Sequence, residues 1–224
     1  MKQVLLATCL LISSMGFGQS NKEGTVSFGA GFSILAQGST LDQTQHVGSS
    51  SLTGTFNQQT GFGIGETFGI RGQYGINKIF GVGAYARVES KFVATSYDNT
   101  YTSNTTDISS IGVGIGLEGR VYLINHKKFN FHAAPALGYE MASTTVTDDN
   151  LNDFNGSLSG LNYGLTGGMN WFFINLSSFA FGMSADIGYN HSSLSGKYAN
   201  SLGDVDQKLS TGGFVIGIGV TAHL

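Results

Sequence analysis

Residue types used in nucleophilic hydrolysis stand close together near the C-terminal end of the chain. His191, Ser192 and Ser193 follow one another, and Asp204 and Asp206 stand about a dozen residues further on. A serine hydroxyl becomes a nucleophile when a neighbouring base takes its proton, and a histidine base needs a carboxylate to fix its tautomer. Histidine and serine are also common in surface loops. We therefore interpret His191 first as an exposed residue beside a serine-rich loop, and we keep hydrolysis as the alternative.

A second chemically active set consists of charged residues that alternate with large apolar ones. Its members are the cations Arg71, Arg87, Lys91 and Arg120 and the anions Glu89, Glu118, Glu140 and Asp186. The positive and negative charges cancel. If these residues line a narrow lumen, they must pair or remain hydrated, because an isolated ion in a low-dielectric space is very costly. We expect a salt-bridged plug, and the alternative is an ion-conducting or proton-relay path.

Acidic residues are also frequent in the polar segments. Asp148, Asp149 and Asn150, with Asp153, suggest a calcium site, but their spacing does not match an EF-hand loop and no glycine stands at the turn. We expect solvated loop acids instead. No phosphate loop, metal-ligand cluster or dinucleotide fingerprint appears elsewhere, so we expect no metal and no cofactor. The formal net charge of −3 leaves no basic footprint for nucleic acid.

The elements that must position these residues are strands, because large apolar residues alternate with small or polar ones at a period of two. The alternating segments cover residues 26–36, 62–76, 80–92, 111–123, 129–141, 161–173, 179–189 and 214–224. In one of them, Phe129 and Phe131 share a phase while Asn130 and His132 share the other. The pattern predicts an all-β fold of eight antiparallel strands.

The apolar phase is too large to form the interior of such a fold. Each segment carries about six apolar positions, and an eight-stranded barrel has an interior only just wide enough for ordinary side chains. This argues against a soluble barrel of the lipocalin type. Turned outward, the apolar phase makes a lipid-facing belt, and the glycine-rich phase lines a narrow lumen. Phe129 to Tyr139 would span about 26 Å at a tilt of about 40°, which is the height of an outer-membrane belt. We predict an up-and-down transmembrane β-barrel.

The connections between the predicted strands alternate in length. Short links fall near 77–78, 125–128 and 174–178, and long ones near 38–60, 95–107, 144–158 and 192–206. This alternation is typical of a membrane barrel, with short turns in the periplasm and long loops outside. No 18-residue apolar run follows the N-terminus, which excludes a helical membrane protein.

The N-terminal residues have the pattern of a cleaved secretory signal peptide. Lys2 supplies the positive charge, residues 4–12 the apolar stretch, and Gly16-Phe17-Gly18 a small-residue cleavage site. We expect residues 1–18 to be the signal peptide and residues 19–224 to be the barrel domain. The only cysteine, Cys9, would then be removed, so that a disulfide or a thiolate site is impossible.

With this alternation over most of Thr25 to Leu224, the chain resembles the OmpA/OmpX-like family of small outer-membrane barrels, the "outer membrane protein β-barrel domain" group. The resemblance is one of architecture and implies a fold and a location. Three residues depart from the pattern: Leu224 stands where an aromatic residue is usual, Pro135 lies within the fifth strand, and Glu66 lies in the lipid-facing phase. Each departure indicates a bulge or a position near the rim.

The arrangement of His191 and Ser193 also resembles the outer-membrane lipid A 3-O-deacylases of the PagL type, which are eight-stranded barrels too. This resemblance implies Ser193 as nucleophile, His191 as base and Asp204 or Asp206 as the orienting acid. Leu194 stands where that family usually has asparagine, and aspartate replaces its glutamate.

We therefore expect a non-enzymatic outer-membrane barrel with a plugged polar lumen and long extracellular loops, in a structural or adhesive role. The alternatives are a lipid A deacylase that faces the outer leaflet and a narrow channel. The expected partners are outer-membrane lipids and lipopolysaccharide, together with extracellular ligands that the loops could bind. We expect a monomer that does not bind nucleic acid.

Overall fold

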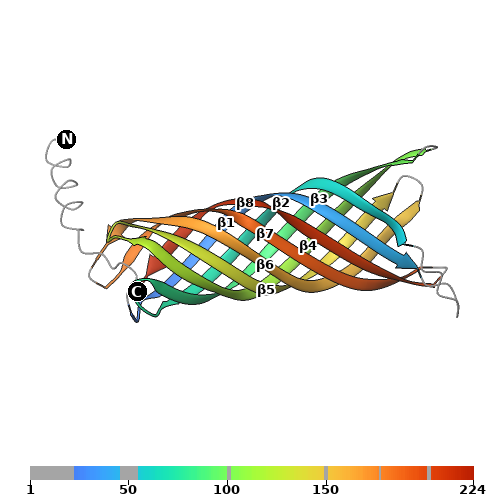
Figure 1. Cartoon of the computed structure of the whole chain (residues 1–224). Coiled ribbons are helices and arrows are strands. Elements are labelled where there is room, and N and C mark those ends of the chain that lie inside the picture. Colours follow the sequence, from blue (N-terminus) through green and yellow to red (C-terminus); the bar gives the residue numbers. More distant parts are fainter. Residues whose placement is uncertain (1–22, 46–54, 100–101, 149–150, 177, 201–202) are drawn as a thin grey trace.

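The computed structural model describes residues 23–45, 55–99, 102–148, 151–176, 178–200 and 203–224. Its strands are β1 (Val26–Gln45), β2 (Thr55–Gly75), β3 (Phe80–Asn99), β4 (Thr102–Asn125), β5 (Phe129–Asp148), β6 (Leu151–Asn175), β7 (Ala180–Asn200) and β8 (Gly203–His223). Each strand pairs antiparallel with the next, and β1 pairs with β8 to close the barrel (Figure 1). The predicted all-β, eight-stranded barrel is confirmed. The predicted signal peptide, residues 1–18, lies outside the described residues.

The strands are staggered as they pass around the barrel. Following cross-strand partners once around leads from Phe28 to Gly38 on the same strand, a displacement of ten residues. The partners on the way are Gly72, Ala84, Leu117, Leu137, Tyr163, His191 and Gly212. Such a stagger requires the strands to tilt by roughly 40°. Because the displacement is even, side chains of one phase face the same side on every strand.

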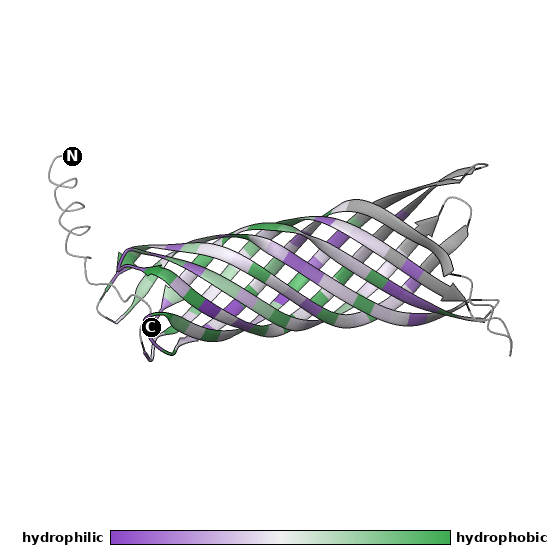
Figure 2. Ribbon diagram, viewed as in Figure 1, coloured by the Kyte–Doolittle hydropathy of each residue, from purple (hydrophilic) through white to green (hydrophobic). Residues whose placement is uncertain are grey.

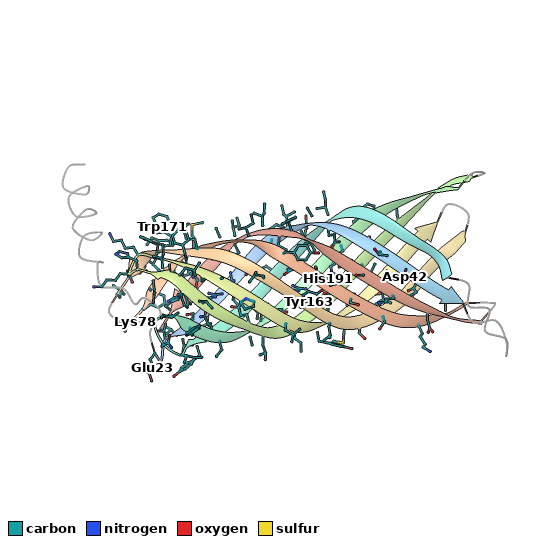
Figure 3. All side chains as sticks on the ribbon, viewed as in Figure 1. Glu23, Asp42, Lys78, Tyr163, Trp171 and His191 are labelled. Atoms are coloured by element: carbon teal, nitrogen blue, oxygen red, sulfur yellow. The ribbon has the colours of Figure 1, made fainter. Side chains whose placement is uncertain are left out.

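The apolar phase points outward, as the sequence predicts. Ile64, Leu117 and Phe214 are exposed to 59%, 70% and 68%, a degree of apolar exposure that suits lipid and not water. Figure 2 shows hydrophobic and hydrophilic residues alternating along the strands. Aromatic side chains lie toward both edges of this belt: Trp171 lies at the end with the short turns and Tyr163 toward the other end (Figure 3). Among the described residues, no helix is long and apolar enough to cross a membrane.

Most of what the sequence suggested to be long loops is strand. The segments between successive strands on that side of the barrel are 46–54, 100–101, 149–150 and 201–202. Backbone pairing runs almost to the tips, as in Ser96 with Thr105 and Thr144 with Gly156. The prediction of long loops near 95–107, 144–158 and 192–206 is therefore wrong. The connection predicted near 38–60 is shorter than expected, because β1 continues to Gln45 and β2 begins at Thr55. These segments are rich in threonine, which favours strands. Because the residues on both faces of these strand ends are polar, they suit strands that are surrounded by water. The hairpin of β3 and β4, green in Figure 1, extends outward at this end.

Pro135 lies in the middle of β5 without a bulge and away from either rim. The register of β4 with β5 is the same at Leu117–Leu137 and at Val121–Ala133, and only the positions that face Pro135 and Ala134 drop out of the ladder. Pairing of Pro135 with Leu165 on β6 is retained. Proline lacks a backbone N–H and so loses a bond on one side only, which corrects the expectation of a bulge.

Glu66 and Leu224 both face outward. Glu66 is exposed, with Ile34 and Ser90 as its cross-strand partners. Its position toward the polar end of the outward face agrees with the expected place near a rim. Leu224 follows β8 at the opposite end, where its backbone exchanges hydrogen bonds with Val26. It therefore continues the ladder in a rim position.

Candidate functional site

The predicted lumen charges all point inward and form two separate neutral groups. One group lies nearer the end of the barrel that carries the long polar hairpins, and it contains Arg87, Lys91, Glu89 and Glu140. Lys91 Nζ lies 2.8 Å from Glu140 Oε1 and 3.2 Å from Glu89 Oε1. Arg87 Nη2 lies 3.3 Å from Glu140 Oε2 and 3.2 Å from Glu89 Oε2. Each carboxylate of this group, called here the outer charge group, therefore has two cationic partners. Ser192 also donates a hydrogen bond of 2.8 Å to Glu140 Oε2.

The second group, the inner charge group, contains Arg71, Asp186, Arg120 and Glu118. Arg71 Nη2 lies 2.5 Å from Asp186 Oδ2, and Arg120 Nη2 lies 2.7 Å from Glu118 Oε1. His132 adds its Nε2 at 3.6 Å from Asp186 Oδ1. Two cations again face two anions. The charge balance of the lumen is thus local, which is the arrangement that a low-dielectric interior requires.

Glycines on the intervening strands make these pairs possible. Gly114 on β4 is the cross-strand partner of both Arg87 on β3 and Glu140 on β5. A β-carbon at Gly114 would lie 3.2 Å from Arg87 Nε, so glycine leaves the arginine room to lie across β4 where a larger residue would crowd it. In the same way, a β-carbon at Gly168 would overlap both Asp186 and His132. The glycine phase is therefore the surface over which long side chains reach one another.

A small cavity of about 150 Å³ separates the two charge groups. Arg71, Arg87, Glu118 and Asp186 contribute to its lining. A polar space of this size can hold several water molecules. Asp186 Oδ1 and Arg87 Nε are buried and have no hydrogen-bond partner among the described residues, and water in the cavity would satisfy them.

Three buried leucines, called here the leucine layer, lie in the lumen beyond the outer charge group. Leu158 on β6, Leu194 on β7 and Leu209 on β8 point inward and are 2%, 1% and 2% exposed. Leu194 and Leu209 are direct cross-strand partners. Their neighbours in the outward phase, Ser195 and Lys208, are exposed. On β7 and β8 this is the reverse of the belt, with leucines inside and polar residues outside, whereas Ser39, Thr144 and Gln207 contribute buried polar side chains to the interior nearby.

The sequence analysis missed this leucine layer because it assigned Leu158 and Leu194 to loops and began the last strand after Leu209. A signal was present: the alternation continues past the belt with its sense inverted, as in Ser193, Leu194 and Ser195.

At the opposite, inner end the lumen is filled by amides and aromatic rings. Asn170 donates a 2.9 Å hydrogen bond to Asn130, and the rings of Phe172 and His223 lie 4.5 Å apart.

The predicted hydrolytic residues are not brought together. His191 and Ser193 lie two positions apart on the outward face of β7, and the serine within reach of His191 is Ser210 on β8, whose Oγ is 3.4 Å from Nε2. Asp206 lies on β8 four residues before Ser210, nearer the hairpin tip, and its carboxylate lies 3.3 Å from Lys197 Nζ. At about 3.3 Å per residue, this separates Asp206 from Ser210 by about 13 Å. The side chain of Asp204 lies outside the described residues.

The acids considered for calcium lie at the hairpin of β5 and β6. Asp148 ends β5 and Asp153 lies in β6, whereas Asp149 and Asn150 lie outside the described residues. Within the described ranges, no group of three or more histidine, cysteine or acidic residues could hold a metal ion.

Comparison with known proteins gives one family and several similar structures. A sequence model of the outer membrane protein beta-barrel domain matches residues 17–207. No curated protein matches the chain in sequence. The structure of the outer membrane protein OprG from Pseudomonas aeruginosa aligns with a TM-score of 0.50 and 13% identity, over 91% of this chain and 97% of OprG.

Two further structures are similar over most of their length. Ail of Yersinia pestis, the attachment invasion locus protein, has a TM-score of 0.38 and 14% identity, over 89% of this chain and 99% of Ail. The outer membrane protease OmpT of Escherichia coli has a TM-score of 0.45 and 7% identity, over 92% and 98%. At 13% identity, the likeness to OprG shows a shared fold and nothing finer.

Proposed function

The chain belongs to the family of outer membrane protein β-barrel domains and resides in the cell outer membrane, and from this premise we propose that it is a non-enzymatic barrel with a closed lumen. It acts through its outer surface. Its role is to stabilise the membrane as a scaffold and to hold polar β-hairpins beyond the bilayer for contact with extracellular ligands.

The observation that carries this proposal is the occupancy of the lumen. Lys91, Glu89 and Glu140 are 3%, 3% and 1% exposed as side chains and are paired with one another. The leucine layer lies directly beyond them. An ion that crossed the barrel would have to break buried ion pairs and then pass an apolar layer, and both steps are costly. These features support a plug over the narrow-channel alternative.

The length of the strands supports a role for the outer end. β5 continues nine residues beyond Tyr139, to Asp148, which at about 3.3 Å per residue and a tilt of about 40° adds about 23 Å beyond the aromatic rim. Ser143, Ser157 and Ser195 are exposed on this extension. Paired strands hold their tips more rigidly than a loop would, because their backbone groups are already hydrogen-bonded.

Electrical recording of the purified barrel tests the closed lumen. In planar bilayers the protein should show no steady conductance above that of a detergent blank, while an open porin inserted in parallel gives clear steps. Stable channel openings in the unmodified barrel would contradict the proposal and favour the channel.

Shortened hairpins test the display role. Joining Ser96 to Thr105 and Thr144 to Gly156 by two-residue Asn-Gly turns removes two tips at paired positions and preserves the hairpin register. In a deletion strain, this variant should restore resistance to detergents but not attachment to surfaces. If attachment is the same with the full chain, the shortened chain and no chain, the hairpins have no adhesive role.

A further inference from the structure

The outward face of β6, β7 and β8 changes from apolar to polar over a few residues. In cross-strand register, Leu165, Tyr189 and Phe214 form one outward row, and Tyr163, His191 and Gly212 form the next. The rows beyond them are Leu161, Ser193 and Ser210, and then Ser159, Ser195 and Lys208. The change places His191 at the level where lipid chains meet headgroups.

Four polar side chains converge at this level. The His191 ring packs against the Tyr163 ring with centroids 4.9 Å apart, and His191 Nε2 lies 3.4 Å from Ser210 Oγ. A β-carbon at Gly212 would overlap the Tyr189 hydroxyl and lie 3.0 Å from His191 Nδ1. Tyr189 and His191 therefore both lean over Gly212 from β7. Figure 3 shows Tyr163 and His191 side by side on the barrel wall.

The side chains of this cluster can donate several hydrogen bonds to an anion. Imidazole, serine and tyrosine groups all supply hydrogen-bond donors. Lys208 is exposed and lies two residues beyond Ser210 on the same face. Asp42 is the cross-strand partner of Lys208 and faces the same side, and Asp206 is paired with Lys197 at 3.3 Å, so each lysine of this region has an acid beside it. No carboxylate is within hydrogen-bond distance of His191 in the described part of the chain.

We propose that Tyr163, Tyr189, His191 and Ser210, with Lys208 above them, form a binding site for the phosphorylated headgroup of an outer-leaflet glycolipid. The phosphate accepts hydrogen bonds from His191 and Ser210 and pairs with Lys208. The acyl chains then lie along the apolar rows below, over Leu165, Ile187 and Ile216, which are exposed to 58%, 61% and 63%. The inference rests on the position of the barrel in the outer membrane and is independent of whether the lumen conducts.

Lipid retention measured by native mass spectrometry tests the site. The full barrel is titrated in detergent with a phosphorylated lipid A-type glycolipid, with its dephosphorylated form and with inorganic phosphate. We expect tight retention of the phosphorylated lipid, at least tenfold weaker retention of the dephosphorylated form, and no competition by millimolar phosphate. Equal retention of the two lipids would refute phosphate recognition. Displacement by inorganic phosphate would refute a lipid site in favour of a simple anion site.

Single substitutions locate the site on the barrel. His191→Ala and Lys208→Ala should each weaken retention of the phosphorylated lipid at least tenfold, and His191→Gln should restore most of it by keeping a donor. His126→Ala and Lys78→Ala are matched controls, because both residues are exposed in turns at the opposite end. Tyr139→Ala is the control for Tyr163→Ala, since Tyr139 is 46% exposed at a comparable level on β5.

Each protein is first checked for the shift in gel migration on boiling that marks a closed barrel. If the His191 and Lys208 variants form barrels and retain lipid as strongly as their controls, the proposed site is wrong. The same measurement leaves the closed lumen untouched, because none of these side chains faces it.

Discussion

The Tyr85 hydroxyl donates a hydrogen bond of 2.6 Å to Asn162 Oδ1, although Tyr85 lies on β3 and Asn162 lies on β6. The tyrosine side chain crosses the lumen over Gly116 on β4 and Gly138 on β5, which are themselves cross-strand partners. A β-carbon at either glycine would overlap the hydroxyl. The width of the lumen and the absence of side chains on two strands therefore act together to permit this bond.

Replacing Gly138 with alanine should destabilise the barrel. The new β-carbon would overlap the Tyr85 hydroxyl and lie 2.5 Å from the carbonyl oxygen of Ile115, and overpacking of this kind costs about 1–3 kcal/mol. Gly167→Ala is the matched control, because Gly167 faces outward and the nearest atom to its β-carbon would be 3.9 Å away. Urea unfolding in lipid vesicles, followed by the fluorescence of the single tryptophan, measures both. Equal stability of the two variants would contradict the role of the lumen glycines.

Reversing the charge of Arg87 should destabilise the barrel much more. Arg87→Glu would place a third carboxylate beside Glu89 and Glu140 with only Lys91 to balance them, and breaking a buried pair costs roughly 3–5 kcal/mol. Lys197→Glu is the control, because Lys197 and Asp206 are 72% and 42% exposed and such surface pairs contribute at most about 1 kcal/mol. The same unfolding experiment applies. A small effect of Arg87→Glu would mean that water reaches the outer charge group freely.

The leucine layer should exclude water-soluble reagents from the lumen. Ser192 is 3% exposed, and the only cysteine lies in the predicted signal peptide, so Ser192→Cys provides a single buried thiol. A charged methanethiosulfonate reagent should modify the Ser192→Cys thiol slowly when the leucines are intact. The rate of modification should rise at least tenfold when Leu194→Ala and Leu209→Ala are added together. Ser195→Cys, which faces outward, should react rapidly in both. Rapid modification of Ser192→Cys with the leucines intact would show that the layer does not seal the lumen.

Substitution of His191 or Ser193 by alanine should leave lipid A acylation unchanged. Base and nucleophile in a hydrolase lie within about 2.6–3.2 Å, whereas Ser210 lies 3.4 Å from His191 and, among the side chains that the structure describes, no acid lies close enough to orient the histidine. Mass spectrometry of lipid A from complemented deletion strains makes the comparison, with the empty strain as reference. Loss of an acyl chain that depends on His191, in a barrel that still assembles, would support the deacylase instead.

The sequence was sufficient to determine which side of the barrel each residue of the belt faces. Alternation alone separates Phe179 and Phe181 from Ser184 and Asp186, and it assigns all eight lumen charges to one phase. This works because the side-chain period of a strand is local: two neighbouring residues face opposite sides whatever the rest of the chain does. It failed at the outer end, where the hairpin tips are polar in both phases and where the alternation that continues, as in Ser193, Leu194 and Ser195, has its sense inverted.

Only the tertiary structure decided which residues meet. The partnership of Arg87 with Glu140, of Tyr85 with Asn162 and of His191 with Ser210 depends on the register of the strand pairs that lie between the partners. A shift of two residues in one of these registers would keep every side chain on the same face and yet exchange the partners across that strand pair. Stagger is set when the first strand closes on the last, and it depends on every strand pair at once. It therefore cannot be derived from the alternation within any single strand.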